Sequence, residues 1–111
     1  GVLATTGALR ARLYENALNE FGIKAVLPSE GGQAEVMSVI YNGVKAGAEN
    51  YDTAALTGEL KQMALKGAGC FILGCTELPI AFEKYGINFP YIDPALILAK
   101  AAIIKAGYAV K

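Results

Sequence analysis

The sequence predicts an α/β fold: a doubly wound, mainly parallel four-stranded sheet flanked by helices. Three observations support this prediction. Short apolar runs alternate along the chain with segments whose apolar residues recur at helical spacing. Glycine or proline stands at most boundaries between these segments. The run at 70–74 has no polar alternation, which is typical of a central parallel strand buried on both faces.

The first half of the chain predicts two strands and two helices. Residues 1–5 are an apolar run that predicts a buried strand. A helix is predicted over 8–21, where the apolar residues at helical spacing are Leu9, Leu13, Ala17 and Phe21. Residues 23–27 predict a second strand, which Pro28 ends. After a glycine-rich loop, a helix is predicted over 33–45, with one apolar face made by Val36, Val39, Ile40 and Val44.

The second half repeats the alternation. A third helix is predicted over 53–66, followed by the central strand over 70–74. A short helix over 77–85 leads to a fourth strand over 89–92 and a last helix over 94–106, for which Asp93 is the predicted N-cap and Pro94 the first helical residue. Because helices connect the successive strands, the sheet is expected to be parallel and covered on both faces.

The last helix is apolar nearly all round, through Leu96, Ile97, Leu98, Ala99, Ala101, Ala102, Ile103 and Ile104. Such a helix needs burial on more than one side, which one small sheet does not supply. We therefore expect residues 1–111 to form a single α/β domain whose C-terminal helix, 94–107, packs on a partner domain or subunit. Self-association through this apolar face, giving a homo-oligomer, is a further expectation.

Composition excludes several classes of function. Ten basic and ten acidic residues give zero net charge without a basic run, which argues against a nucleic-acid partner. The apolar stretches are far shorter than the ~20 residues that span a membrane. Histidine is absent, so histidine-based catalysis and histidine metal sites are excluded. Because the two cysteines lack the further ligands that a zinc site normally needs, no metal site is predicted. The sequence has no phosphate-binding glycine motif after a strand, so no cofactor is predicted either. Unpaired cysteines favour a cytoplasmic location.

Two predicted strand-to-helix turns are candidates for a site, at 4–7 and at 74–79. In open α/β sheets, ligands bind outside the carboxyl ends of the strands. Thr5, Thr6 and Thr76 place hydroxyl groups there beside free backbone N–H groups, an arrangement that binds carboxylate or phosphate. The alternative role of these threonines is helix capping.

Cys75 is the more informative of the two cysteines. It precedes a predicted helix, whose positive end favours the thiolate and is expected to lower the thiol pKa, and Gly74 leaves room for a ligand. The alternative is a small apolar residue in a buried turn. Glu77 could orient an ammonium group or help to move a proton, or it is simply an acidic residue favoured by the helix dipole. Cys70 begins the central strand and is expected in the core.

These residues carry a resemblance to a known family. Residues 74–79 resemble the second cysteine motif of the aspartate/glutamate racemases, which work without pyridoxal phosphate. Supporting similarities cover nearly the whole chain: Val2 to Gly7, Pro28-Ser29, Gln33, Ile40-Tyr41, Lys45 to Gly47, and Tyr91 to Pro94. The resemblance implies a flavodoxin-like domain from a two-domain enzyme, and glutamate at position 77 points toward the aspartate racemase branch.

The resemblance implies a two-base mechanism without a cofactor, in which two cysteines act on opposite faces of an acidic amino acid. Cys75 and Glu77 would be the catalytic residues here, while Thr5, Thr6 and Thr76 would hold the substrate carboxylate. The family's first cysteine, in an N-terminal domain, has no counterpart in this sequence, and Cys70 lies on the same strand as Cys75. We therefore expect the C-terminal half of a longer racemase, with little activity of its own.

Two alternatives stay open at this point. The chain could be a non-catalytic module that binds a carboxylate or serves assembly. It could also belong to an enzyme of the same fold with another reaction, since hydantoin racemases, maleate isomerases and arylmalonate decarboxylases use the same cysteine positions.

Overall fold

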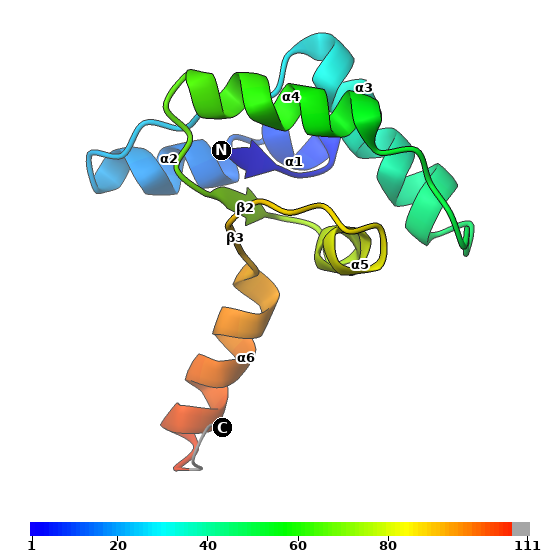
Figure 1. Cartoon of the computed structure of the whole chain (residues 1–111). Coiled ribbons are helices and arrows are strands. Elements are labelled where there is room, and N and C mark those ends of the chain that lie inside the picture. The colour runs from blue at the N-terminus through cyan, green and yellow to red at the C-terminus, as the bar shows by residue number, and fades with distance from the viewer. Residues whose placement is uncertain (108–111) are drawn as a thin grey trace.

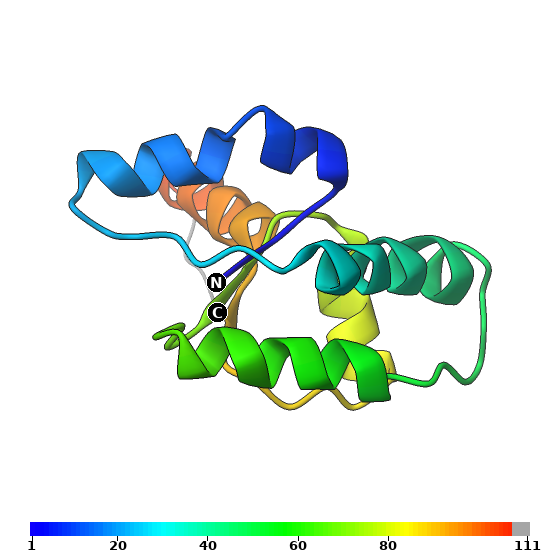
Figure 2. The same cartoon turned by 90° about the horizontal axis from the view of Figure 1, so that it is seen from above.

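A computed structural model describes residues 1–107. It confirms the α/β class, with a parallel sheet of three strands, β1 (Val2–Leu3), β2 (Phe71–Leu73) and β3 (Tyr91–Ile92), in the order β1-β2-β3. Helices α1 (Thr6–Arg10) and α2 (Leu13–Glu20) lie on one side of the sheet and α4 (Ala54–Leu65) on the other (Figure 2). The remaining elements are α3 (Glu30–Ser38), the π-helix η1 (Val39–Val44), α5 (Glu77–Lys84) and α6 (Pro94–Lys105), as Figure 1 shows.

The predicted strand at 23–27 is wrong, so the described part of the chain has three strands where we expected four. This segment runs beside β1 and makes one backbone hydrogen bond to it, from Val2 N to Val26 O at 3.0 Å. Ile23 is 53% exposed, so the segment lacks the burial that holds a strand in register.

Two predicted helices differ from the structure in their course. The helix over 8–21 starts earlier, at Thr6, and is divided because Arg12 adopts a left-handed conformation with φ of +56°. The helix over 33–45 begins at Glu30, where the Ser29 hydroxyl oxygen accepts a hydrogen bond from Gly32 N. It then widens into η1, in which Lys45 N donates to Ile40 O, five residues back.

The core lies on one face of the sheet. Phe71 and Leu73 of β2 pack with apolar residues of α3, η1, α4 and α5: Val36, Val39, Ile40, Leu56, Leu60, Met63, Leu78, Ala81 and Phe82. Each of these side chains is 2% exposed or less. This burial fixes the carboxyl ends of β1 and β2, where the candidate site lies.

Helix α6 projects away from the rest of the molecule (Figure 1). Asp93 caps it as predicted, since its carboxylate accepts a hydrogen bond from Leu96 N. The helix has no buried residue, and Leu98 and Ile104 are 72% and 62% exposed. A face this apolar is typical of a surface that contacts another chain or domain.

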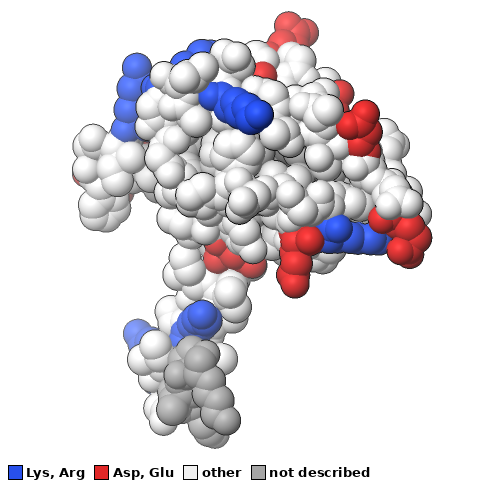
Figure 3. All heavy atoms as spheres, in the orientation of Figure 1, with Lys and Arg blue, Asp and Glu red and all other residues white. Residues whose placement is uncertain are grey.

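Charged side chains are scattered over the face shown in Figure 3, with no continuous basic patch. Within residues 1–107, no helix is long and apolar enough to cross a bilayer.

Candidate active site

The two predicted turns lie side by side at the carboxyl ends of β1 and β2. These strands pair in parallel with Leu3 opposite Leu73, and Gly74 N donates to Leu3 O at 2.7 Å. Continuing this register brings the Thr5–Thr6 turn next to the Cys75–Thr76 turn. The structure therefore brings the predicted site residues to one edge of the sheet, as expected for a parallel α/β fold.

Cys75 is engaged with the predicted acidic residue. Its thiol donates a hydrogen bond to Glu77 Oε2 at 2.7 Å, and the Thr76 hydroxyl donates to the same oxygen at 3.1 Å. The Lys45 ammonium, from the turn after η1, lies 3.9 Å from Glu77 Oε1 and also over the ring of Tyr41. The Glu77 carboxylate therefore interacts with a thiol, a hydroxyl group and an ammonium group at the same time.

This arrangement sets the protonation of both groups. Burial, followed by the hydrogen bond to Glu77, raises the pKa of the Cys75 thiol above its ordinary value. The pKa of Glu77 is lowered, chiefly by the hydrogen bond from Cys75. Our expectation of a lowered thiol pKa is wrong, because burial and the neighbouring carboxylate outweigh the positive end of the short helix. Near neutral pH the site holds a protonated thiol beside an ionised carboxylate.

The two hydroxyl groups of the first turn have different neighbours. Thr5 is the N-cap of α1, and its hydroxyl oxygen accepts from Ala8 N at 3.3 Å. The Thr6 hydroxyl oxygen accepts from Gln33 Nε2 at 3.3 Å, and the same nitrogen donates to Ala4 O at 2.9 Å. Sequence reasoning did not assign Gln33 or Lys45 to the site. Their contacts depend on helix packing, which no local motif signals.

The room at Gly74 is used by the protein itself. A Cβ at this position would come within 2.7 Å of the Tyr14 ring, which packs over the backbone just before Cys75. The expectation that Gly74 leaves space for a ligand is therefore wrong, since an aromatic side chain of α2 occupies that space.

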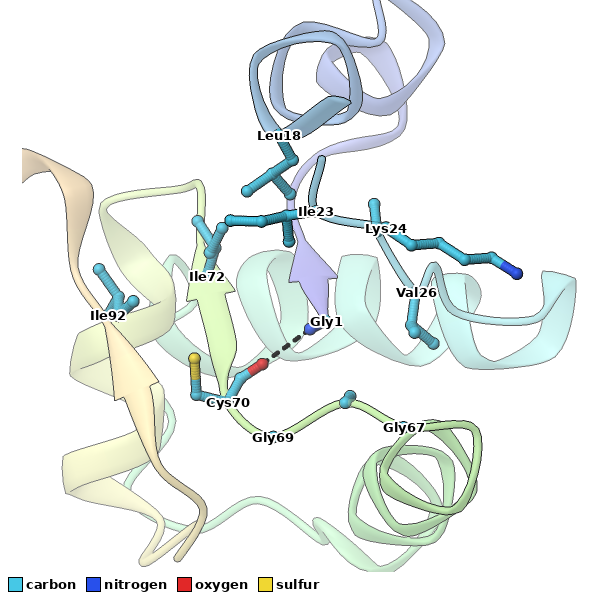
Figure 4. Close-up of a pocket in the computed structure, with 12 residues that line it drawn as sticks. Gly1, Leu18, Ile23, Lys24, Val26, Gly67, Gly69, Cys70, Ile72 and Ile92 are labelled. Carbon is cyan, nitrogen blue, oxygen red and sulfur yellow. Dashed lines mark hydrogen bonds between the residues drawn. The ribbon is translucent and has the colours of Figure 1, made fainter. Parts of the chain in front are cut away.

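Cys70 lies at the opposite end of β2. Its carbonyl oxygen accepts a hydrogen bond from the Gly1 amino group at 2.7 Å, and its side chain lines a cavity of about 380 Å³ (Figure 4). Apolar side chains such as Ile23, Ile72 and Ile92 also line this cavity. Cys70 is half-buried rather than fully in the core as expected. Cys70 is five residues from Cys75, roughly 16 Å along an extended strand. The two thiols are therefore too far apart to act on the same carbon atom of a bound ligand.

Across residues 1–107, no cluster of three or more cysteine and acidic side chains is arranged to hold a metal ion. The groups at this edge of the sheet can transfer protons, through a thiol and a carboxylate, and can form hydrogen bonds through hydroxyl groups.

The raised thiol pKa predicts a measurable dependence of stability on pH. A group whose pKa is higher in the folded state stabilises the fold below its unfolded pKa, and this contribution is lost as the pH rises through its folded pKa. We expect the free energy of unfolding of the wild-type chain to fall, relative to that of Cys75→Ser, as the pH rises above about 9. Urea unfolding of both chains between pH 7 and pH 10.5 measures this, and parallel curves would contradict the raised pKa.

Comparisons with known proteins identify the family of the chain. The family model for Asp/Glu/Hydantoin racemase matches residues 1–102. An uncharacterized protein in the pnlA 3′ region of Pectobacterium carotovorum subsp. carotovorum is 35% identical over 109 residues, which cover 93% of this chain and 69% of that protein. A crystal structure of a proposed Asp/Glu racemase from Yersinia pestis superposes with a TM-score of 0.77 at 25% identity.

The Yersinia pestis match covers 96% of this chain but 47% of the other, so the chain spans about half the length of that solved relative. The resemblance inferred from the cysteine turn is confirmed by both the family model and the structural match. With its parallel sheet and strand-end cysteine, the chain belongs to the Asp/Glu/hydantoin racemase family of isomerases.

Proposed function

We propose that the chain supplies one catalytic face of a cofactor-independent racemase that interconverts the L- and D-forms of aspartate or glutamate. The observation that carries this proposal is the Cys75 thiol, hydrogen-bonded to Glu77 at the carboxyl end of β2 and next to the Thr5–Thr6 turn. A protonated thiol held at a strand end is suited to deliver a proton to a carbon atom.

In the proposed step, the Cys75 thiol gives its proton to one face of the substrate Cα while a base on the opposite face removes the original α-proton. Cys75 is left as a thiolate, the opposing base is left protonated, and the configuration at Cα is inverted. The Thr5 and Thr6 hydroxyls are proposed to hold the substrate carboxylate, where fixed donors stabilise the developing charge, and Thr76 to hold Glu77 through the hydrogen bond that its hydroxyl donates. Glu77 is proposed to hold Cys75 in position, because its carboxylate accepts a hydrogen bond from the Cys75 thiol.

The opposing base is proposed to come from outside these residues, because Cys70 lies at the other end of β2. The chain would then correspond to the C-terminal half of a longer racemase and be nearly inactive alone. A cytoplasmic location fits this chemistry, since the proton transfer requires a reduced thiol. The apolar helix α6 is proposed as the contact surface, either for another domain or, in the isolated chain, for a second copy.

The proposed function is tested by protection of Cys75 from alkylation. We compare two single-thiol variants, Cys70→Ser, which keeps Cys75, and Cys75→Ser, which keeps Cys70, as a matched pair. L-aspartate is expected to slow iodoacetamide labelling of Cys75 severalfold and to leave the labelling of Cys70 unchanged. Equal rates with and without L-aspartate in both variants would overturn the proposal.

Circular dichroism tests the absence of the opposing base. We expect the isolated chain to leave the optical signal of L-aspartate unchanged over hours, although L-aspartate protects Cys75. A rapid loss of the signal would show that this chain holds both bases. Protection without any racemisation, even in a longer protein that contains this domain, would instead favour the carboxylate-binding alternative.

A further inference from the structure

We propose that Gln33 is a positioning residue that presets the Thr5–Thr6 turn to bind a carboxylate. The inference rests on the proposed function and deepens it. Gln33 lies in the first turns of α3, while the turn it contacts follows β1, 27 residues earlier in the chain. Its amide nitrogen donates to Ala4 O at 2.9 Å and to Thr6 Oγ1 at 3.3 Å.

The orientation of this amide is fixed by its neighbours. A backbone carbonyl only accepts hydrogen bonds, so the nitrogen of Gln33 must face Ala4 O. The amide oxygen then points the other way. It is buried and finds no hydrogen-bond partner within residues 1–107. A buried acceptor without a partner costs stability, so the contacts of this side chain are better explained by what they do for the turn than by what they add to the fold.

Both hydroxyl oxygens of the turn accept hydrogen bonds from N–H groups. Gln33 donates to Thr6, and Ala8 N donates to Thr5. The hydroxyl protons of Thr5 and Thr6 are therefore left to be donated elsewhere. Two O–H donors on adjacent residues suit a ligand that only accepts hydrogen bonds, such as an ionised carboxylate.

Thr76 differs from these two residues. Its hydroxyl already donates to Glu77 Oε2 at 3.1 Å. Binding of the carboxylate is accordingly assigned to Thr5 and Thr6, while Thr76 helps to hold Glu77. The division of roles follows from which hydroxyl protons are already used.

Two substitutions of Gln33 test this role, made in the Cys70→Ser background so that Cys75 labelling reports ligand binding. Gln33→Met keeps the length of the side chain and removes both the donor and the unpartnered oxygen. Gln33→Glu keeps the shape but replaces the donor by an oxygen. Gln62→Met, at an exposed position on α4, is the matched control.

We expect both Gln33 variants to need a three- to tenfold higher concentration of L-aspartate to protect Cys75. A change of this size corresponds to the loss of about one hydrogen bond that orients the turn. The thermal midpoint of Gln33→Met should equal or exceed that of the wild-type chain, because the unpartnered oxygen is gone. Gln62→Met should change neither value.

The outcomes separate this inference from the proposed function. Unchanged protection in Gln33→Met and Gln33→Glu, with a lowered thermal midpoint, would show that Gln33 is only structural and would overturn the inference alone. Failure of L-aspartate to protect Cys75 even with Gln33 intact would overturn the proposed function, and this inference with it.

Discussion

Replacing Phe71 by alanine is expected to lower the free energy of unfolding by about 3–5 kcal/mol. Phe71 is 1% exposed in the middle strand of the sheet and packs edge-on against Phe89, with ring centroids 5.6 Å apart. A Cβ built on Gly1 would come within 2.7 Å of its ring, so the first residue of the chain also packs tightly against it. Urea unfolding followed by circular dichroism measures the change.

Phe21→Ala provides the matched control, because Phe21 is 81% exposed at the end of α2. Its removal should change the free energy of unfolding by about 0.5 kcal/mol or less. Similar losses in the two variants would mean that the core is not centred on β2. Since small domains are stable by only about 5–15 kcal/mol, Phe71→Ala could leave a large fraction of the chain unfolded.

Placing a charge on α6 is expected to weaken self-association at least tenfold. A buried leucine contributes roughly 1.5–3 kcal/mol, and each 1.4 kcal/mol changes a dissociation constant tenfold. Leu98→Lys removes a side chain that is 72% exposed in the single chain and that would be covered in a dimer. Light scattering across a concentration series should show the wild-type chain associating and Leu98→Lys remaining monomeric.

Leu65→Lys is the control for solubility, since Leu65 is 81% exposed on α4, away from α6. It should associate like the wild-type chain. A wild-type chain that stays monomeric at high concentration would count against α6 as a contact surface between copies.

Much of the fold could be predicted because the signals are local. The alternation of apolar runs and helical segments identified β1, β2, β3 and the helices, and Asp93 before Pro94 marked the start of α6. The segment 23–27 was misassigned because apolar composition does not reveal whether a neighbouring strand offers a full ladder of hydrogen bonds. The break at Arg12 has no signal in the sequence, since left-handed backbone is typical of glycine or asparagine rather than arginine.

The site residues likewise fall into two groups, those that the local sequence predicts and those that only helix packing places. Cys75, Thr76 and Glu77 are neighbours in sequence, so their grouping could be predicted, and Thr5 and Thr6 follow from the rule for parallel strand ends. Gln33, Lys45 and Tyr14 reach the site through helix packing, so sequence reasoning did not place them there. The direction of the Cys75 pKa was mispredicted because it depends on burial, which only the packed structure determines.

The π-helical segment at Val39–Val44 sets the direction in which the Lys45 side chain leaves the helix. One such turn is equivalent to an α-helix that has gained a single residue. Loss of one residue there could be absorbed by rewinding the turn, which would leave the helix continuous. Rewinding the turn without losing a residue would instead rotate Lys45 by about 100° around the helix axis, away from the Glu77 carboxylate. The wide turn is thus what directs the Lys45 ammonium toward the acid that it neutralises.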